Sequence, residues 1–526
     1  MKVHPIILSL PMIAGLTLAV SAQAQTPQRG GQLEFAISQG EPATFDCHAA
    51  SSVNVMFRVA PHYSTLLRID PANYPNVIGD LAQSWTVSPD GKLYTFKLAA
   101  NAKFHDGTAL TSEDVKVSLD RIRNPPQGVV SVRKELLADI AEITTPDATT
   151  VVVRLANANA AMPAIFAMPY GCIYSAKLLQ TDPDYPAKKV MGSGPFKFVK
   201  YTPGAEWVGE RNADFYRQGL PYLDGFKALS LAPAATINAL AAGQVAFDFR
   251  GVSRAEADRI VQARGDKVNV YESNPAISLL FYIAFNAEKG PLADPRVRRA
   301  LALSIDHLAG SKVIERSSPI AAIGGLVRPG SQFARPDAEL AKLPGFSSDM
   351  AAARAEAKKL LAEAGQSDLK LTFLNRRPWP FIGVFLIDQF KQIGVTLTHD
   401  QQDDPQFFAR RNTGAYDMIL DALPDYIDDP TIQWAGFKSF DKNPGNSGRY
   451  TDSKVDDLLE KQARETDPKS RITLVRQLED HILNQAYVMP FFWSKRITTV
   501  ETSVQGYVAA PTNFIGIDLE RFWLKK

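Results

Sequence analysis

The chain has 526 residues, of which 45% are hydrophobic and 22% are charged, and its formal net charge is +2. This length is too great for one hydrophobic core, and the composition is that of an ordinary globular protein. No block of Lys and Arg stands out, which argues against a nucleic-acid-binding protein.

The N-terminus has the pattern of a secretory signal peptide. Lys2 precedes an apolar run from Ile6 to Val20, and Ala22-Gln23-Ala24 is a small-x-small cleavage site. A membrane anchor is the alternative, but the run is shorter than the ~18 residues that a span needs. We therefore expect cleavage after Ala24 and a soluble periplasmic protein.

The first half of the mature chain is patterned mainly as strands. Residues 30–37 alternate between polar and apolar, and 85–98 read as a hairpin around a Ser-Pro-Asp-Gly turn. Thr111 and Asp114 form a capping box that starts a helix. Further strands are expected at 196–199, 207–209 and 245–249, with a helix over 234–242.

The stretch from Phe281 to His307 combines a strand, a turn and a capped helix. Asp294 is placed to cap the helix, and Pro295 occupies the first helical position. The buried face is expected to consist of Val297, Ala300, Leu301, Ser304, Ile305 and Leu308. Arg296, Arg298 and Arg299 then fall mostly on the solvated side.

The second half alternates helices with strands, which favours α/β lobes. Helices are expected at 350–364, 382–393, 452–465 and 469–485, and strands at 369–373 and 395–397.

Cys47 and Cys172 are the only cysteines. They could form a disulfide in an oxidising compartment or remain two separate buried thiols.

Four long motifs, in order, resemble one family. They are Leu81 to Val115, Gly192 to Tyr216, Phe281 to His307, and Tyr416 to Pro430. Together they are similar to the family 5 solute-binding proteins, the extracytoplasmic receptors of peptide and nickel ABC importers. The resemblance implies an α/β, two-lobed periplasmic-binding-protein fold of type II, with a discontinuous first lobe, an extra small lobe and two hinge crossings.

The same resemblance implies the division of the chain. We expect a signal peptide at 1–24. Lobe I is expected at 25–50, 187–275 and 491–526, the small lobe at 51–186, and lobe II at 276–490. The crossings should lie near Asn274-Pro275 and near Phe491.

Binding rather than catalysis is the expected chemistry. The sequence has no G-x-S-x-G, G-x-x-x-x-G-K-[ST], G-x-G-x-x-G or H-E-x-x-H motif. His48 with His62 is a weak metal possibility, and we expect neither a metal site nor a cofactor. A secreted hydrolase acting through the acidic run at 417–429, or a periplasmic chaperone, are the competing classes.

Two segments carry the ligand anchors that the resemblance implies. In peptide-binding relatives an Asp of the D-[YN]-x-x-P segment holds the ligand's amino group. Asp425 fits that position with a one-residue shift, whereas Tyr426 fits it without a gap. Asp428 and Asp429 read as capping residues before Pro430. Arg377 resembles the Arg that pairs with the peptide carboxylate.

Further cleft contacts are expected from aromatic and small residues, each of which could instead be ordinary packing. They are Trp379, Trp434, Ser51, Ser52, Gly192 and Ser193. The expected function is capture of a solute between two closing lobes, with a peptide as the leading ligand and a nickel chelate, oligosaccharide or opine-like solute as alternatives. The expected partners are the ABC permease and its ATPase subunits. We expect a monomer that reaches the membrane only through the permease complex.

Overall fold

The computed structural model describes residues 26–526 except 39, 43, 51, 130, 274–278, 315–319, 378 and 424–426. The predicted signal peptide and the predicted crossing at Asn274-Pro275 lie outside the described residues. No helix within the described ranges is long and apolar enough to cross a bilayer.

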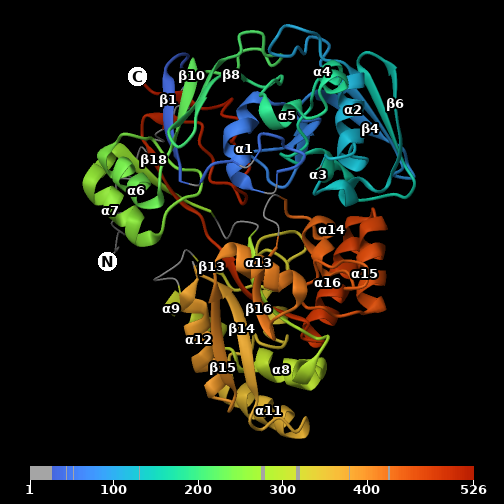
Figure 1. Cartoon of the computed structure of the whole chain (residues 1–526), viewed down its shortest axis with the longest axis vertical. Coiled ribbons are helices and arrows are strands. Elements are labelled where there is room, and N and C mark those ends of the chain that lie inside the picture. Colours follow the sequence, from blue (N-terminus) through green and yellow to red (C-terminus); the bar gives the residue numbers. More distant parts are fainter. Residues whose placement is uncertain are drawn as a thin grey trace, which may run out of the picture.

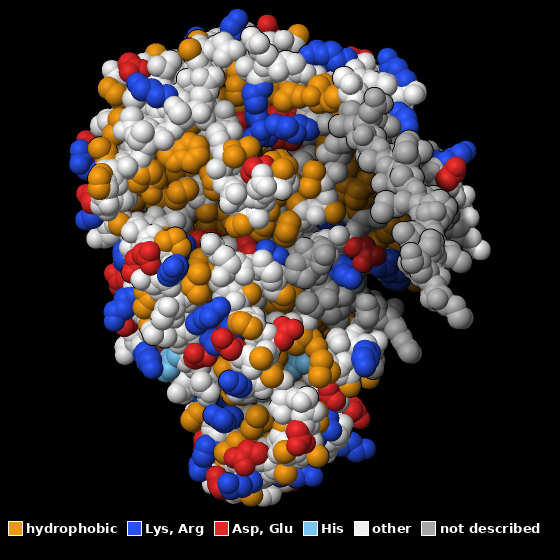
Figure 2. Space-filling view, turned by 180° about the vertical axis from the view of Figure 1, so that it is seen from behind, with side chains coloured by type: hydrophobic (Ala, Val, Ile, Leu, Met, Phe, Trp, Pro, Cys, Tyr) orange, Lys and Arg blue, Asp and Glu red, His pale blue; other side chains and the backbone are white. Residues whose placement is uncertain are grey.

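Two bodies are stacked along the long axis of the molecule (Figure 1). The upper body contains the N-terminal half together with the last residues of the chain, and the lower body contains most of the second half. This arrangement confirms the predicted two-lobed α/β fold. Seen from behind, hydrophobic side chains gather in the upper body and around its lower margin, whereas acidic and basic side chains are mixed over the lower body (Figure 2).

Lobe I is built on a four-stranded sheet in the order β1-β10-β9-β8, in which β1 runs parallel to β10 and the other pairs are antiparallel. Its strands are β1 (Gln32–Ile37), β8 (Phe196–Thr202), β9 (Glu206–Arg211) and β10 (Gly225–Ser230). Its main helices are α1 (Val53–Val59), α6 (Pro233–Ala242) and α7 (Arg254–Arg264). The short strand pairs are β2 (Leu67–Ile69) with β3 (Val77–Gly79), β11 (Val268–Glu272) with β18 (Ile497–Glu501), and β19 (Val504–Gln505) with β20 (Trp523–Leu524).

The small lobe has an antiparallel sheet in the order β4-β5-β7-β6. Its elements are β4 (Ala82–Val87), β5 (Leu93–Leu98), β6 (Ile140–Asp147), β7 (Thr150–Leu155), α2 (Ser112–Arg123), α3 (Met162–Phe166), α4 (Ala176–Thr181) and α5 (Tyr185–Lys188). The predicted capping box is confirmed, because Asp114 accepts a hydrogen bond from the Thr111 backbone N–H at 2.7 Å.

Lobe II contains a six-stranded mixed sheet in the order β13-β17-β12-β16-β14-β15, with a hydrophobic core on each face. Its strands are β12 (Leu280–Phe285), β13 (Ile320–Ala322), β14 (Lys370–Arg376), β15 (Thr396–Gln402), β16 (Met418–Ala422) and β17 (Val488–Ser494). Its helices are α8 (Pro295–Ser304), α9 (His307–Ile314), α10 (Asp337–Leu340), α11 (Met350–Glu363), α12 (Pro380–Lys391), α13 (Asp404–Thr413), α14 (Pro430–Gln433), α15 (Ser453–Arg464) and α16 (Pro468–Asn484).

Helix α8 begins as predicted but differs in its packing. Asp294 caps it by accepting a hydrogen bond from the Arg296 N–H, and Pro295 is its first residue. The prediction that Arg298 is solvated is wrong. Arg298 is only 3% exposed, and it donates hydrogen bonds to the carbonyl oxygens of Leu292 and Gln485. The helix also ends at Ser304, so Leu308 lies on α9 with 56% of its surface exposed.

The second crossing falls later than predicted. Strand β17 pairs with β12 through Trp493, and Ser494 pairs with β13, so both residues belong to lobe II. Lobe I resumes at Ile497, which pairs with β11. The crossing therefore lies at 495–496 instead of near Phe491, because the apolar run that contains Phe491 is a buried strand of the lower sheet.

The small lobe is not an independent body. Its apolar residues and those of lobe I form one continuous cluster, from Leu33 to Phe522, which Ile427 and Ile432 of lobe II also join. Helix α1, which was predicted in the small lobe, packs on lobe I, because Arg58 donates a 2.9 Å hydrogen bond to Ser230 of β10. The expected strand at 245–249 is also reduced to a single bridge between Ala36 and Asp248.

Candidate functional site

Ser273, the last described residue before the gap at 274–278, lies beside Arg496 of the second crossing, at one edge of the interface between the lobes. Ser273 and Arg496 exchange hydrogen bonds, from the Ser273 N–H to the Arg496 carbonyl at 3.0 Å and from the Arg496 N–H to the Ser273 hydroxyl at 2.9 Å. The Arg496 guanidinium also donates to the Asn513 side chain and to the Ala510 carbonyl. These bonds fasten the crossings to lobe I, so rotation between the lobes would concentrate just beyond them.

The opposite edge is closed by direct contact between the small lobe and α15. The Ala160 N–H donates to the Ala463 carbonyl at 2.9 Å, and the Arg464 guanidinium lies 2.7 Å from the Asp139 carboxylate. Asn159 donates to the second oxygen of Asp139 at 2.9 Å and so orients it. Figure 1 shows α14 and α15 directly below α3, away from the crossings. The lobes are therefore linked covalently at one edge and by these polar contacts at the other, and Ile427 and Ile432 of lobe II add apolar contact with the upper body.

Most of the predicted acidic run is already paired within lobe II. Asp421 lies 2.8 Å from Arg411, and the buried Asp428 lies 2.9 Å from Arg328. Asp429 caps α14 and also forms an ion pair with Arg471. The capping interpretation is thus confirmed for Asp429, whereas Asp428 acts as an ion-pair partner. These pairings leave little free carboxylate for hydrolytic chemistry.

Asp417 accepts a hydrogen bond from the Thr372 N–H at 2.8 Å, which joins β14 to the residue before β16. Asp425 and Tyr426 lie outside the described residues, as does Ser51. The structure therefore carries no description of the predicted amine anchor.

The Arg-Pro-aromatic loop contains two arginines with different surroundings. Arg377 is 68% exposed and forms an ion pair with Asp403 at 2.6 Å. The guanidinium of Arg376 lies 4.9 Å from the ring centre of Trp379 and 5.6 Å from that of Phe408. Such stacking holds a guanidinium in place by cation–π attraction. Arg376 is thus the more rigidly positioned of the two.

Four predicted cleft residues are buried, packed against backbone or engaged in a helix cap. Trp434 has no exposed surface and donates to the Leu326 carbonyl, so it belongs to a core of lobe II and does not line the cleft. Ser193 is fully buried. A side chain at Gly192 would collide with the His62 carbonyl, which explains the glycine by close backbone approach. Ser52 is exposed and caps α1.

Cys47 and Cys172 form a disulfide with their Cα atoms 6.1 Å apart. Beside it, the buried Asp46 pairs with Arg121 at 2.7 Å, and His48 bonds to the Cys172 carbonyl. Burial lowers the pKa of His48 to about 4, so the ring is neutral at physiological pH. These contacts join the N-terminal segment of lobe I to the small lobe. No group of three or more metal-ligating side chains occurs in the described part of the chain.

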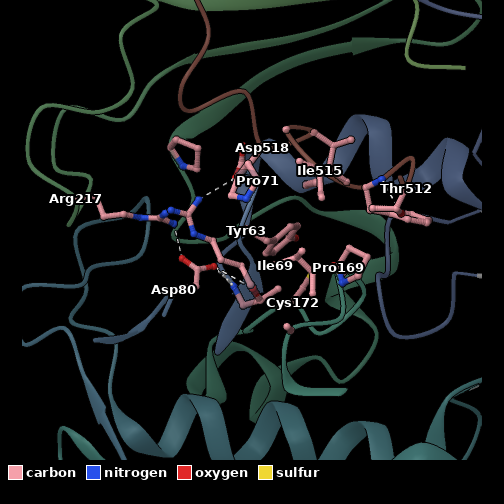
Figure 3. Close-up of a pocket in the computed structure, with 18 residues that line it drawn as sticks. Tyr63, Ile69, Pro71, Asp80, Pro169, Cys172, Arg217, Thr512, Ile515 and Asp518 are labelled. Carbon is pink, nitrogen blue, oxygen red and sulfur yellow. Dashed lines mark hydrogen bonds and ion pairs between the residues drawn. The ribbon is translucent and has the colours of Figure 1, made fainter. Parts of the chain in front are cut away.

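A cavity of about 80 Å³, called here the lobe I cavity, lies where lobe I meets the small lobe, beneath the C-terminal segment (Figure 3). Tyr63, Ile69 and Ile515 contribute apolar wall, whereas Arg217 and Asp518 contribute polar groups. Since ~10–15 Å³ suffices for one water, the space admits a small molecule of a few heavy atoms. No motif in the sequence indicates this cavity, because its lining comes from segments hundreds of residues apart.

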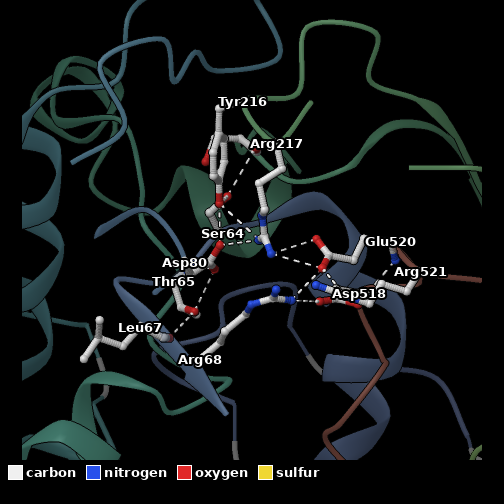
Figure 4. Close-up of polar contacts among 11 residues, drawn as sticks. Ser64, Thr65, Leu67, Arg68, Asp80, Tyr216, Arg217, Asp518, Glu520 and Arg521 are labelled. Carbon is white, nitrogen blue, oxygen red and sulfur yellow. Dashed lines mark hydrogen bonds and ion pairs between the residues drawn. The ribbon is translucent and has the colours of Figure 1, made fainter. Parts of the chain in front are cut away.

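A network of charges borders the cavity (Figure 4). Arg217 bridges Asp80 and Glu520, with 2.9 Å to the latter, and Arg68 lies 2.6 Å from Glu520. Asp80 also accepts hydrogen bonds from the Thr65 N–H at 2.8 Å and from the Tyr216 hydroxyl. The network ties the C-terminal segment to β2 and to the loop after β9.

Two lobes of mixed α/β structure, joined by paired crossings and touching again at the far edge, define a bilobal binding protein. The chain belongs to the bacterial extracellular solute-binding proteins, family 5, whose family model matches residues 76–444. A Brucella ovis protein with the provisional name of ABC transporter peptide-binding protein is 30% identical over 357 residues, covering 63% of this chain. The chain spans 62% of the length of that relative.

Solved structures resemble almost the whole chain. AgaA of A. tumefaciens R10, solved with agropinic acid, is 28% identical, with a TM-score of 0.78 over 94% of this chain and 99% of that one. DppA of Helicobacter pylori, solved with the peptide STSA, has a TM-score of 0.80 over 95% of this chain and 99% of that one. Its 22% identity supports the fold alone.

Proposed function

We propose that this protein is the solute-capturing component of an ABC importer. The observation that carries the proposal is the double connection between the lobes, by the crossings at 273 and 496 and by the contact of the small lobe with α15. A solute held between the lobes would gain contacts in the closed form that the open form lacks, and that difference would drive closure. The importer's permease and ATPase subunits would then receive the closed form. No bond in the solute is made or broken.

In this proposal, two rigid units move relative to each other when the cleft closes, and we assign them from the described contacts. Lobe I and the small lobe share one core, so they move together as the upper unit. Lobe II, up to Ser494, is the lower unit. The protein works as a monomer in the periplasm, after removal of a signal peptide ending at Ala24.

A peptide is the leading solute. The provisional name of the Brucella relative supports this choice. An opine-like solute is the second candidate, because the 28% identical AgaA structure holds agropinic acid. Asp425 remains the proposed partner of the ligand's amino group. Arg376 joins Arg377 as a proposed partner of its carboxylate, because aromatic rings position its guanidinium.

The test is a thermal-shift screen of the chain from Gln25 against dipeptides, longer peptides, agropinic acid, nickel chelates and oligosaccharides. A ligand at a thousand times its Kd should stabilise the protein by about 4 kcal/mol. A shift confined to peptides supports the leading assignment, and one confined to agropinic acid supports the second. Turnover of any compound would refute the receptor role.

For the ligand identified, Arg376→Ala and Arg377→Ala should be compared directly. We expect Arg376→Ala to weaken binding of ligands that carry a carboxylate, and to leave their amidated or esterified analogues unaffected. Equal binding of both forms by the wild-type protein would refute carboxylate recognition. Likewise, Asp425→Asn should weaken binding of peptides with a free amino group and leave binding of N-acetylated peptides unaffected.

A further inference from the structure

We propose that the lobe I cavity is a second binding site, which takes a small organic cation such as an alkylammonium or guanidinium group, with Asp518 as its charge partner. The lining of the site comes from lobe I and from the small-lobe segment that contains Ala167, Pro169 and Cys172, and no residue of lobe II contributes to it. It does not depend on which solute the cleft takes.

Asp518 is the carboxylate of the network that lacks a close partner. Its nearest cation is the Arg68 guanidinium at 3.7 Å, but that guanidinium lies much closer to Glu520, at 2.6 Å. The only hydrogen bond that Asp518 accepts in the described structure comes from the Glu520 N–H, at a long 3.3 Å. Asp80 and Glu520, in contrast, each have a guanidinium in direct contact.

The Asp518 carboxylate faces the cavity. Its side chain is 32% exposed, whereas that of Glu520 is 1% exposed, and it lines the space with Arg68 and Arg217. In Figure 3, Asp518 lies at the upper side of the cavity, and Ile69 and Pro169 lie on the other side of the open space. A cation entering from the cavity would therefore meet a carboxylate oxygen whose existing ion pair, with Arg68 at 3.7 Å, is long.

The charges around Asp518 select a cation over an anion. The groups that face it are Arg68 from β2, Arg217 from the loop after β9, Asp80, Glu520 and, beyond Glu520, Arg521. The guanidinium groups of Arg68 and Arg217 are engaged by carboxylates, and the Nε atoms of both are buried away from the cavity. An anion entering the cavity would be repelled by the Asp518 carboxylate.

The apolar wall of the cavity determines which uncharged group the ligand can carry beside its cationic end. Tyr63, Ile69, Pro71, Phe514 and Ile515 all contribute to the lining. They would contact the alkyl part of a short amine, while the charged end would pair with the carboxylate. A bare metal cation is disfavoured, because the lining offers too few oxygen ligands close together.

The ionisation of Asp518 gives the site a pH dependence. Burial and the neighbouring Glu520 raise the pKa of Asp518 to about 6. A cation binds the ionised carboxylate, so affinity should be greatest above pH 6 and should fall as the pH drops below it. This profile differs from that of an ordinary surface carboxylate, which would hold its charge down to about pH 4.

The experiment is a titration of the mature protein with propylammonium and, separately, guanidinium chloride, followed by isothermal calorimetry and NMR at constant ionic strength. We expect saturable binding that weakens at least about tenfold in Asp518→Asn, because the charge-assisted contact is lost. Asp184→Asn, at an exposed acid of the same unit, is the matched control and should bind as the wild type does. Ala167→Leu, which fills part of the cavity, should also abolish binding.

The outcomes of this titration distinguish binding in the lobe I cavity from binding in the cleft between the lobes. Binding of propylammonium that is unchanged in Asp518→Asn, or no saturable binding by the wild-type protein, would overturn the proposal. Competition by a peptide or by agropinic acid would place the amine in the cleft and would also overturn it. The thermal-shift screen tests the cleft independently, so failure of one proposal leaves the other standing.

Discussion

The contact between Arg464 and Asp139 gives the sharpest test of lobe closure. It lies at the edge of the interface away from the crossings, so any opening about the crossings must break it. Truncation by Arg464→Ala removes the ion pair and the hydrogen bond to the Ala158 carbonyl, while the backbone bond between Ala160 and Ala463 remains. The variant should therefore destabilise the closed form selectively.

The expected size follows from the burial of the pair. The side chains of Arg464 and Asp139 are 33% and 18% exposed, and salt bridges that exposed are worth ~0.2–1 kcal/mol after screening. About 1 kcal/mol lost from the closed form alone would weaken solute binding up to about fivefold. The free energy of unfolding of lobe II should change little, since α15 keeps its own core contacts.

The assay is calorimetric measurement of Kd for the solute that the screen identifies, in a double-mutant cycle with Asp139→Ala. Lys461→Ala is the matched control, because Lys461 pairs with Asp457 on the same helix and touches no residue of the small lobe through that pair. Small-angle X-ray scattering of ligand-free Arg464→Ala should show a larger radius of gyration. Strictly additive effects of the two mutations, or an unchanged Kd, would refute the reasoning.

Three further predictions concern stability. Loss of the disulfide in Cys47→Ser or Cys172→Ser should cost about 4–5 kcal/mol of unfolding free energy, because it closes a loop with a sequence separation of 125. Urea unfolding with and without a reductant measures this, and equal midpoints would contradict it. Arg298→Ala should destabilise lobe II by about 3 kcal/mol through the unpaired carbonyls it leaves, whereas the exposed Arg299→Ala should be neutral, as thermal melts can check. His48 has a folded pKa of about 4 against 6.5 unfolded, so stability should fall as the pH drops from 6.5 towards 4, and His48→Gln should flatten that slope.

Local features were predictable from the sequence because their causes are local. The cap at Asp294 and Pro295 starts α8, and the capping box at Thr111 starts α2. Both depend on residues within one helical turn of each other. The two-lobed fold was predicted from motifs that each span a whole supersecondary unit.

Features that depend on distant segments were not predictable. Helical periodicity predicted that the Arg298 side chain is exposed to solvent. In the structure its guanidinium donates hydrogen bonds to the carbonyl oxygen of Gln485, at the end of α16, and these bonds make its burial favourable. The buried run through Phe491 is equally apolar whichever lobe receives it, so the crossing was misplaced. The pair between Arg68 and Glu520 joins residues 452 positions apart, and no spacing in the sequence indicates it.

The small lobe has a mechanical role that its size alone would not indicate. It shares a core with lobe I, and the disulfide at Cys47 together with the pair between Asp46 and Arg121 fixes its inner edge. Because it cannot swing on lobe I, its contact with α15 is presented at a fixed position. The free energy of that contact therefore stabilises the closed form directly, because the small lobe does not move relative to lobe I. A family member with a flexible small lobe would gain less from the same ion pair.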